Sequence, residues 1–239
     1  MILSSHQPNY LPYPGLLAKI NCSDYFVYMS NVQFEKQSWQ SRNKIFGSKS
    51  YLSIPINKKF HFKKISEIEV DNSKNWSEKH FKSLYFSYKK APFFKNYIDF
   101  FEKIYRRKWK YLNDLNIEIT NFLIKELDIK TKILFDTDFS FEGKKNERLI
   151  KMCNSIKCDS YLSSKGSSLY IELNKFKTNS INHYFFEYIY SRYNQYKRED
   201  KFESGLTIFD MLFFCGKEQT MKMIKAKENI KISKNWQSL

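Results

Sequence analysis

The chain contains 239 residues, of which 42% are hydrophobic, so it can bury a core and is not a disordered protein. Lysine and arginine outnumber aspartate and glutamate by 41 to 25, and the net charge of +16 favours anionic partners such as nucleic acid, anionic lipid or nucleotide-linked substrates. The lysines are scattered along a sequence rich in Lys, Asn, Ile, Phe and Tyr, so we interpret most of this charge as compositional.

The first predicted element is a short apolar strand at residues 1–3, followed by a polar and stiff loop. Residues 4–15 hold a histidine, two carboxamides and two tyrosines among three prolines and a glycine. Proline fixes φ and restricts the residue before it, so this loop is pre-shaped. Rigid loops at strand ends often carry binding and catalytic groups, whereas the simpler interpretation is an N-terminal turn.

A helix is predicted at 14–21 and a buried strand at 25–29, which with residues 1–3 form a parallel β–α–β unit. The second strand leads into another polar cluster at 31–43. Carboxyl ends of parallel strands emerge at one edge of a sheet, where open α/β folds bind ligands. We therefore expect the two polar clusters to meet, the alternative being that 31–43 is a solvated loop with one packed tryptophan.

Residues 51–56 and 65–70 are predicted to be two strands of a hairpin. From 75 to 128 the apolar period becomes helical, with a break at Pro92. We expect the aromatic stripe of these helices to be core rather than a base-stacking platform. His80 lies on that stripe and is expected to be packed and hydrogen-bonded.

The second half of the chain alternates strands and helices, which favours further parallel pairing. A helix at 207–214 is expected to end before Gly216, and the basic tail after Ile224 is expected to fray. Together the elements predict a single α/β domain over 1–239, with a mixed, partly parallel sheet, flanking helices and a helical insertion around 75–128. The remaining predicted elements are strands at 132–135, 160–164 and 181–189 and a helix at 146–156.

Familiar signatures of other protein classes are missing. The sequence has no P-loop, GxGxxG, HExxH or GxSxG, and residues 165–168 (KGSS) are interpreted as a turn rather than a phosphate cradle. The four cysteines fit no zinc or disulfide spacing, and Cys22 is expected to be structural. Without a signal-peptide pattern or a long apolar run, we expect a cytoplasmic protein that does not insert into a membrane.

Several short motifs resemble the WbqC-like protein family, and the resemblance covers essentially the whole chain. Members of that family occur in bacterial gene clusters for O-antigen and related surface polysaccharides, which implies a cytoplasmic role in building an unusual sugar. The activity proposed for the family is transfer of glycine, or another small acyl unit, to an amino sugar. The motifs are HQPNYLP at 6–12, DYFV at 24–27, VQF at 32–34, SWQ at 38–40, RN at 42–43, ERL at 147–149, YLS at 161–163, YNQ at 193–195 and LTIFD at 206–210.

In one place the sequence departs from the family pattern. The family typically has an acidic pair before the valine and glutamine, where this chain has Ser30 and Asn31. A carboxylate that could orient His6 or bind a substrate amine is therefore missing at that position. Asn31 can form hydrogen bonds there, but it cannot accept a proton.

The leading hypothesis is an acyltransferase or aminoacyltransferase that acts on a nucleotide-linked amino sugar. His6 is the best candidate for the general base, because its unperturbed pKa lies nearest neutrality. Gln7 and Asn9 join it as catalytic candidates, since carboxamides can orient sugar hydroxyls or stabilise an oxyanion. The predicted substrate-binding residues are Tyr10, Asn31, Gln33, Lys36, Trp39, Arg42, Asn43, Glu147, Arg148 and Asp210.

Each substrate-binding candidate has an expected role. Arg42 and Lys36 would hold phosphates, while Tyr10 and Trp39 would offer flat faces to a base or sugar ring. Gln33 and Asn43 would share the carboxamide roles of Gln7 and Asn9. Glu147 and Asp210 are reserve carboxylates, and we expect Arg148 to pair with one of them.

The acyl donor remains open at this point. An aminoacyl-tRNA, an acyl-CoA and an acyl carrier protein are all anionic and would suit the positive charge, and no resident cofactor is expected. The alternative functions are a sugar-nucleotide isomerase, dehydratase or hydrolase that uses His6, and a non-catalytic module that binds nucleotide-sugars or RNA.

Overall fold

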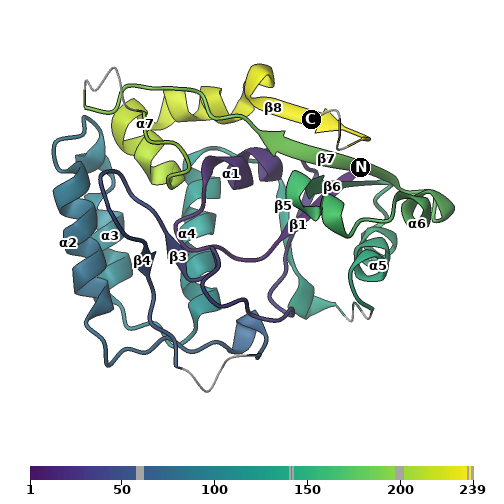
Figure 1. The fold of residues 1–239 in the computed structure, drawn as a ribbon, viewed down its shortest axis with the longest axis horizontal. Coiled ribbons are helices and arrows are strands. Elements are labelled where there is room, and N and C mark those ends of the chain that lie inside the picture. The colour runs from purple at the N-terminus through teal and green to yellow at the C-terminus, as the bar shows by residue number, and fades with distance from the viewer. Residues whose placement is uncertain (58–61, 140, 142, 197–201, 236, 238–239) are drawn as a thin grey trace.

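The computed structural model describes residues 1–57, 62–139, 141, 143–196, 202–235 and 237. Its centre is a six-stranded sheet in the order β5-β2-β1-β6-β7-β8 (Figure 1). Neighbouring strands pair in parallel except β8, which is antiparallel to β7. The α/β class with a mixed, partly parallel sheet is therefore confirmed. The strands are β1 (Ile2–His6), β2 (Tyr25–Tyr28), β5 (Lys132–Phe135), β6 (Ser160–Ser164), β7 (Asn182–Tyr188) and β8 (Ile230–Ser233).

The predicted β–α–β unit is confirmed at the N-terminus. β1 pairs in parallel with β2 from Leu3 opposite Tyr25 to His6 opposite Tyr28. The connecting helix α1 (Pro14–Asn21) begins at a proline, which suits the first helical turn. Gly15 lets this helix start close to β7, because a Cβ added there would lie 2.8 Å from the Cβ of Tyr188.

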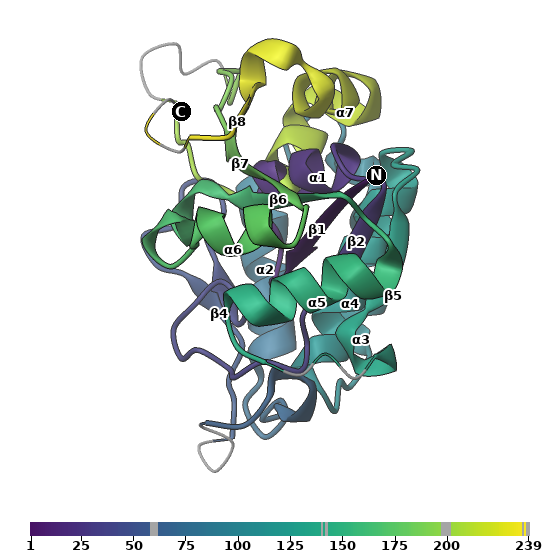
Figure 2. The same ribbon diagram turned by 90° about the vertical axis from the view of Figure 1, so that its right-hand side faces the viewer.

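Helices cover both faces of the sheet. Leu3 and Val27 point to a core shared with α5 (Asn146–Ile156) and α6 (Leu173–Thr178), which lie in front of the sheet in Figure 2. Phe26 and Tyr28 point to the opposite core, which they share with α1, α4 (Leu112–Glu126) and α7 (Ile208–Lys225). This alternation follows from the two-residue period of a strand that is buried on both faces.

The helical insertion extends the second core away from α5 and α6 (Figure 1). It consists of α2 (Trp76–Tyr88), α3 (Ile98–Arg106) and α4, with a 3₁₀ turn at Phe94–Asn96. The α2 stripe is buried, so the aromatic positions are core, as predicted. His80 Nδ1 hydrogen-bonds the Tyr10 hydroxyl at 2.8 Å, which confirms its packed, hydrogen-bonded role.

Two predicted features differ in the structure. The segment 65–70 forms a 3₁₀ helix at Ile65–Glu67 rather than a strand, and residues 58–61 of the predicted hairpin lie outside the described residues. The short strand β4 (Leu52–Ser53) pairs with β3 (Arg42–Asn43), and the two segments of the predicted hairpin meet at an antiparallel bridge between Ile56 and Val70.

The described residues that follow α7 form a 3₁₀ turn at Lys227–Asn229 and the strand β8, where the sequence predicted fraying. Within α7 a first helical segment ends at Gly216, whose φ of 74° is not helical, as predicted; a second segment follows to Lys225, and β8 then pairs with β7. The edge of β7 offers unpaired backbone groups, and the alternating Ile230 and Ile232 suit a strand beside it.

Candidate functional site

A cavity of about 800 Å³ opens at the carboxyl ends of β1, β2 and β6. Numbered in chain order, the sheet strands run 3-2-1-4-5-6, the order of doubly wound nucleotide-binding sheets. Their switch point lies between β1 and β6, where ligands bind in such folds. The described lining comprises Ser5, His6, Gln7, Lys19, Met29, Asn31, Val32, Gln33, Glu35, Gly143, Lys144, Lys145, Arg148, Leu149, Tyr161, Ser163, Ser164, Gly166, Ser167 and Tyr170.

The cavity forms where the two central strands, β1 and β6, stop pairing before they end. The ladder between β1 and β6 ends at Ser4 opposite Leu162, whereas β1 follows β2 to His6 and β6 follows β7 to Ser164. The two central strands therefore separate for their last residues. The side chains at those strand ends form the floor of the cavity.

His6 lines the cavity as a neutral imidazole. Its Nδ1 lies 2.8 Å from the Gln7 carbonyl oxygen, which can only accept, so Nδ1 carries the proton and Nε2 is left as an acceptor. Burial, and then the charge of Lys19, lower the pKa of His6 to about 3. The cavity thus holds an imidazole that stays unprotonated throughout the neutral range.

The two polar clusters of the sequence meet, as the parallel pairing predicts. Gln40 Nε2 donates to Gln7 Oε1 at 2.9 Å, and the Tyr10 amide donates to the Trp39 carbonyl at 3.0 Å. Asn116 of α4 joins them by donating to the carbonyls of Pro8 and Gln40. The segment 31–43 is therefore the supporting layer of the first loop rather than a free solvated loop.

Three predicted site residues are buried and lie outside the cavity lining. Tyr10 is fully buried and bonds Tyr105 at 2.5 Å, so it cannot offer a face to a ligand. Asn43 donates to the Leu11 carbonyl and holds that residue at a positive φ of 46°. Asn9 is also buried and does not line the cavity.

Three others face a different part of the surface. Lys36 and Arg42 line a separate cavity of about 320 Å³ beside β4. Arg42 stacks over Tyr51 at 4.4 Å, and Trp39 packs edge-on against the same ring. None of the three side chains belongs to the lining of the β1–β6 cavity.

The three site candidates from the second half of the chain lie in different places. Arg148 lines the cavity and pairs with Asp136 at 2.8 Å, rather than with Glu147 or Asp210. Glu147 is exposed and outside the lining. Asp210 is buried elsewhere, where Tyr193 and Gln195 donate to it, and burial raises its pKa to about 6.

Asp136 supports a wall of the cavity, and the sequence did not reveal it. It is fully buried just after β5, and it accepts the backbone amides of Ser30 and Asn31 at 2.9 and 3.0 Å. A carboxylate thus lies beside the position where the family's acidic pair is missing. Asp136 directly follows β5, which pairs with β2. The strand order would therefore have suggested this contact.

Lys19 and Ser164 were also missed. Lys19 is 1% exposed in the middle of α1, and its Nζ donates to the Ser5 carbonyl at 3.0 Å and to Ser164 Oγ at 3.1 Å. Burial lowers the pKa of this amine to about 7. The available signal was a lone lysine within the apolar run GLLAKI.

A sequence profile of the WbqC-like protein family matches residues 7–222. The chain belongs to the WbqC-like protein family. The uncharacterized protein Rv1507c of Mycobacterium tuberculosis is 30% identical over 217 residues, which cover 89% of this chain and 93% of that protein. No solved structure matches the chain significantly.

The matched WbqC-like region contains every described residue of the cavity except Ser5 and His6, which directly precede it. Within the described chain, no group of three or more His, Cys, Asp or Glu side chains is arranged to hold a metal ion. The described helices include none that is long and apolar enough to cross a membrane.

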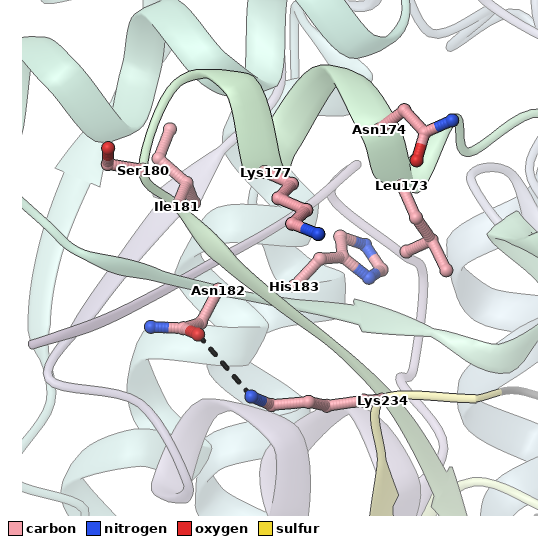
Figure 3. A pocket seen from close by; sticks show the side chains of 8 residues that line it. All are labelled: Leu173, Asn174, Lys177, Ser180, Ile181, Asn182, His183 and Lys234. Atoms are coloured by element: carbon pink, nitrogen blue, oxygen red, sulfur yellow. Dashed lines mark hydrogen bonds between the residues drawn. The ribbon is translucent and has the colours of Figure 1, made fainter.

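A second, smaller cavity of about 420 Å³ lies at the amino-terminal end of β7, beside Asn182 and His183 (Figure 3). Its wall combines the end of α6 with Asn182, His183 and Lys234, and Lys234 Nζ donates to Asn182 Oδ1 at 3.5 Å. His183 is buried and bonds Ser163 Oγ at 3.0 Å through Nε2. None of the residues predicted from the sequence lies there.

Proposed function

We propose that this WbqC-like protein is an enzyme that transfers an aminoacyl group, such as glycyl, or another small acyl group to the amine of a nucleotide-linked amino sugar. The setting would be the biosynthesis of a bacterial surface polysaccharide in the cytoplasm. The observation that carries the proposal is the composition of the cavity at the β1–β6 switch point.

The charge of that cavity suits a nucleoside diphosphate. Its described lining contains four basic side chains, Lys19, Lys144, Lys145 and Arg148, and one carboxylate, Glu35. Asp136 anchors Arg148 through one terminal nitrogen, which leaves other guanidinium donors for a ligand. A cluster of this sign in a cleft favours a phosphate-bearing substrate.

Uncharged polar groups on the same walls suit a sugar. Gln7, Asn31 and Gln33 provide carboxamides, and Ser5, Tyr161 and Ser163 provide hydroxyls. In this proposal His6 presents its unprotonated Nε2 to the attacking amine and accepts the amine proton as the general base. Its lowered pKa means that it passes the proton on rather than retaining it.

The acyl donor would be an activated ester or thioester. An aminoacyl-tRNA is such an ester, and an acyl-CoA or an acylated carrier protein is such a thioester. All three are anionic and complement the net charge of +16.

A thermal-shift screen with nucleotide-linked amino sugars tests the acceptor. A ligand that binds the native state raises the unfolding midpoint by mass action, so one sugar nucleotide should raise it for the wild type. Arg148→Met should weaken that response, whereas Lys36→Met, a cation outside the cavity, should not. A response to tRNA alone that disappears with salt, with no response to any sugar nucleotide, would overturn the proposal.

A further inference from the structure

Lys19 is in an unusual position for a charged side chain. It lies on a helix whose residues from Pro14 to Ile20 are all buried, and its ammonium reaches the floor of the cavity. Within the described chain its partners are one carbonyl and one hydroxyl, and no carboxylate pairs with it. Burying a cation without a counter-charge is costly, so the neutral amine is favoured.

Ser164, the hydroxyl partner of Lys19, lines the cavity. It is the last residue of β6, it is half-buried, and its side chain lines the cavity where β1 and β6 separate. A short 3₁₀ helix, Lys165–Leu169, follows directly and turns the chain away. The hydroxyl is therefore presented at a strand end, open to a ligand on one side and bonded to Lys19 on the other.

The hydrogen bonding allows the amine to act as a base. A neutral Lys19 keeps two N–H groups and one lone pair, so it can still donate to the Ser5 carbonyl at 3.0 Å. Its lone pair then accepts the Ser164 O–H across the 3.1 Å contact. Burial lowers the pKa of Lys19 to about 7, so a large share of the molecules hold this form near neutrality.

Other ionisable groups near the pair do not replace it. The His6 imidazole faces Lys19 from β1 and is neutral, and Tyr13, from the loop before α1, interacts with Ser164 as a phenol whose pKa is raised by burial. Glu35 and Arg148 line the cavity from other elements, and Arg148 is held by Asp136. A lysine with a hydroxyl partner and no nearby counter-charge is the arrangement of serine–lysine nucleophiles.

We propose that Ser164 is a nucleophile activated by Lys19 and that it carries the acyl group as a covalent ester during transfer. The inference rests on the proposed function for the class of reaction and names its intermediate. Ser164 Oγ attacks the carbonyl carbon of an ester or thioester donor while Lys19 Nζ takes the hydroxyl proton. The donor's alcohol or thiol leaves with that proton.

The second half of the reaction restores the enzyme. The amine of the acceptor attacks the Ser164 ester, an amide bond forms, and the bond between the acyl carbon and Ser164 Oγ breaks. Ser164 regains a proton from the amine, through His6 or Lys19. The sum is donor plus amine giving amide plus alcohol or thiol, with no oxidation and no further reactant.

The test is acylation of the full chain with p-nitrophenyl acetate, followed by peptide mapping by mass spectrometry. We expect one acetyl group on Ser164 that neutral hydroxylamine removes, because it is an ester, whereas acetyl groups on surface lysines are stable amides. Ser164→Ala and Lys19→Arg should each lower the hydroxylamine-sensitive label at least tenfold. Ser168→Ala, a nearby serine outside the cavity lining, should label as the wild type does.

Other outcomes overturn the inference. A stable acetyl amide on Lys19, or no hydroxylamine-sensitive label on Ser164, would show that Ser164 is not the nucleophile. Mapping of the wild type decides this even if a variant fails to fold, and Ser164→Cys should recover a label as a thioester. Because the probe contains no sugar, a failed label leaves sugar-nucleotide binding untouched, and a label without sugar binding overturns only the proposed acceptor.

Discussion

Two cations reach the same cavity, and their surroundings differ. Arg148 meets the buried carboxylate of Asp136, which also binds the backbone amides at the end of β2. Lys19 meets a carbonyl and a hydroxyl and has no carboxylate partner in the described chain. The paired cation is a fixed part of the wall, while the unpaired one can give up its proton. Asp136 fixes the always-charged Arg148 in the cavity wall, whereas Lys19 is an amine without a counter-charge and can lose its proton.

Removing the counter-charge of Arg148 should have the largest effect. Asp136→Ala leaves a buried guanidinium and two backbone amides without an acceptor, so we expect a loss of about 3–5 kcal/mol in the free energy of unfolding. Urea denaturation measures this. Adding Arg148→Met to that variant should recover part of the loss, and an equal loss in both would mean that the ion pair is not its cause.

Removing Lys19 should raise the free energy of unfolding rather than lower it. The folded-state pKa of about 7 lies below the usual value of 10.5, so the unfolded chain binds more protons between these values. The stability contribution of Lys19 therefore rises with pH from about 7 towards 10.5, and below 7 its burial costs the most. We expect Lys19→Met to be more stable than the wild type at pH 6, with a smaller gain at pH 9.

Urea denaturation of both proteins from pH 6 to 9 reads this difference. Lys19→Gln, which keeps a hydrogen-bond donor, serves as the control for the contacts with Ser5 and Ser164. A Lys19→Met variant that is less stable at every pH would show that the lysine is structural.

The cluster around Tyr10 should respond as core. Tyr10→Phe leaves His80 Nδ1 and the Tyr105 hydroxyl without a partner, which should cost about 1–3 kcal/mol of unfolding free energy. The affinity for a sugar nucleotide, measured by isothermal titration calorimetry, should change less than about twofold, because a fully buried residue cannot touch the ligand. A large loss of affinity at unchanged stability would show that Tyr10 contributes to the ligand site.

The smallest effect is expected at Lys36. This exposed cation lies outside the cavity, so Lys36→Ala should shift the free energy of unfolding by no more than about 0.5 kcal/mol. Sugar-nucleotide affinity, read by the same calorimetry, should also stay unchanged. A tenfold loss of affinity would place the phosphates beside β4 instead.

Features that depend on local sequence pattern and on parallel strand pairing could be predicted from the sequence. The β–α–β unit and the meeting of the His6 loop with residues 31–43 follow from strand order and proline-rich stiffness. Tyr10 and Asn43 were misjudged because a side chain that bonds a ligand and one that bonds its own loop look the same in a sequence.

Long-range contacts decided the rest. Lys19 looks like a solvated lysine until Ser164, 145 residues later, lies beside it. Arg148 was expected to pair with Glu147 or Asp210, whereas its partner is Asp136, which directly follows β5. The tail was expected to fray because an edge for β8 to join exists only once β7 is placed.

The most direct test of the cavity as the ligand site is the imidazole NMR spectrum during a titration with a nucleotide-linked amino sugar. The chain has four histidines, and single substitutions such as His6→Asn assign their signals. We predict that the His6 signal moves, while that of His80 in the helical core stays in place. Movement of His183 with a stationary His6 would place the ligand at the other end of the sheet and contradict this account.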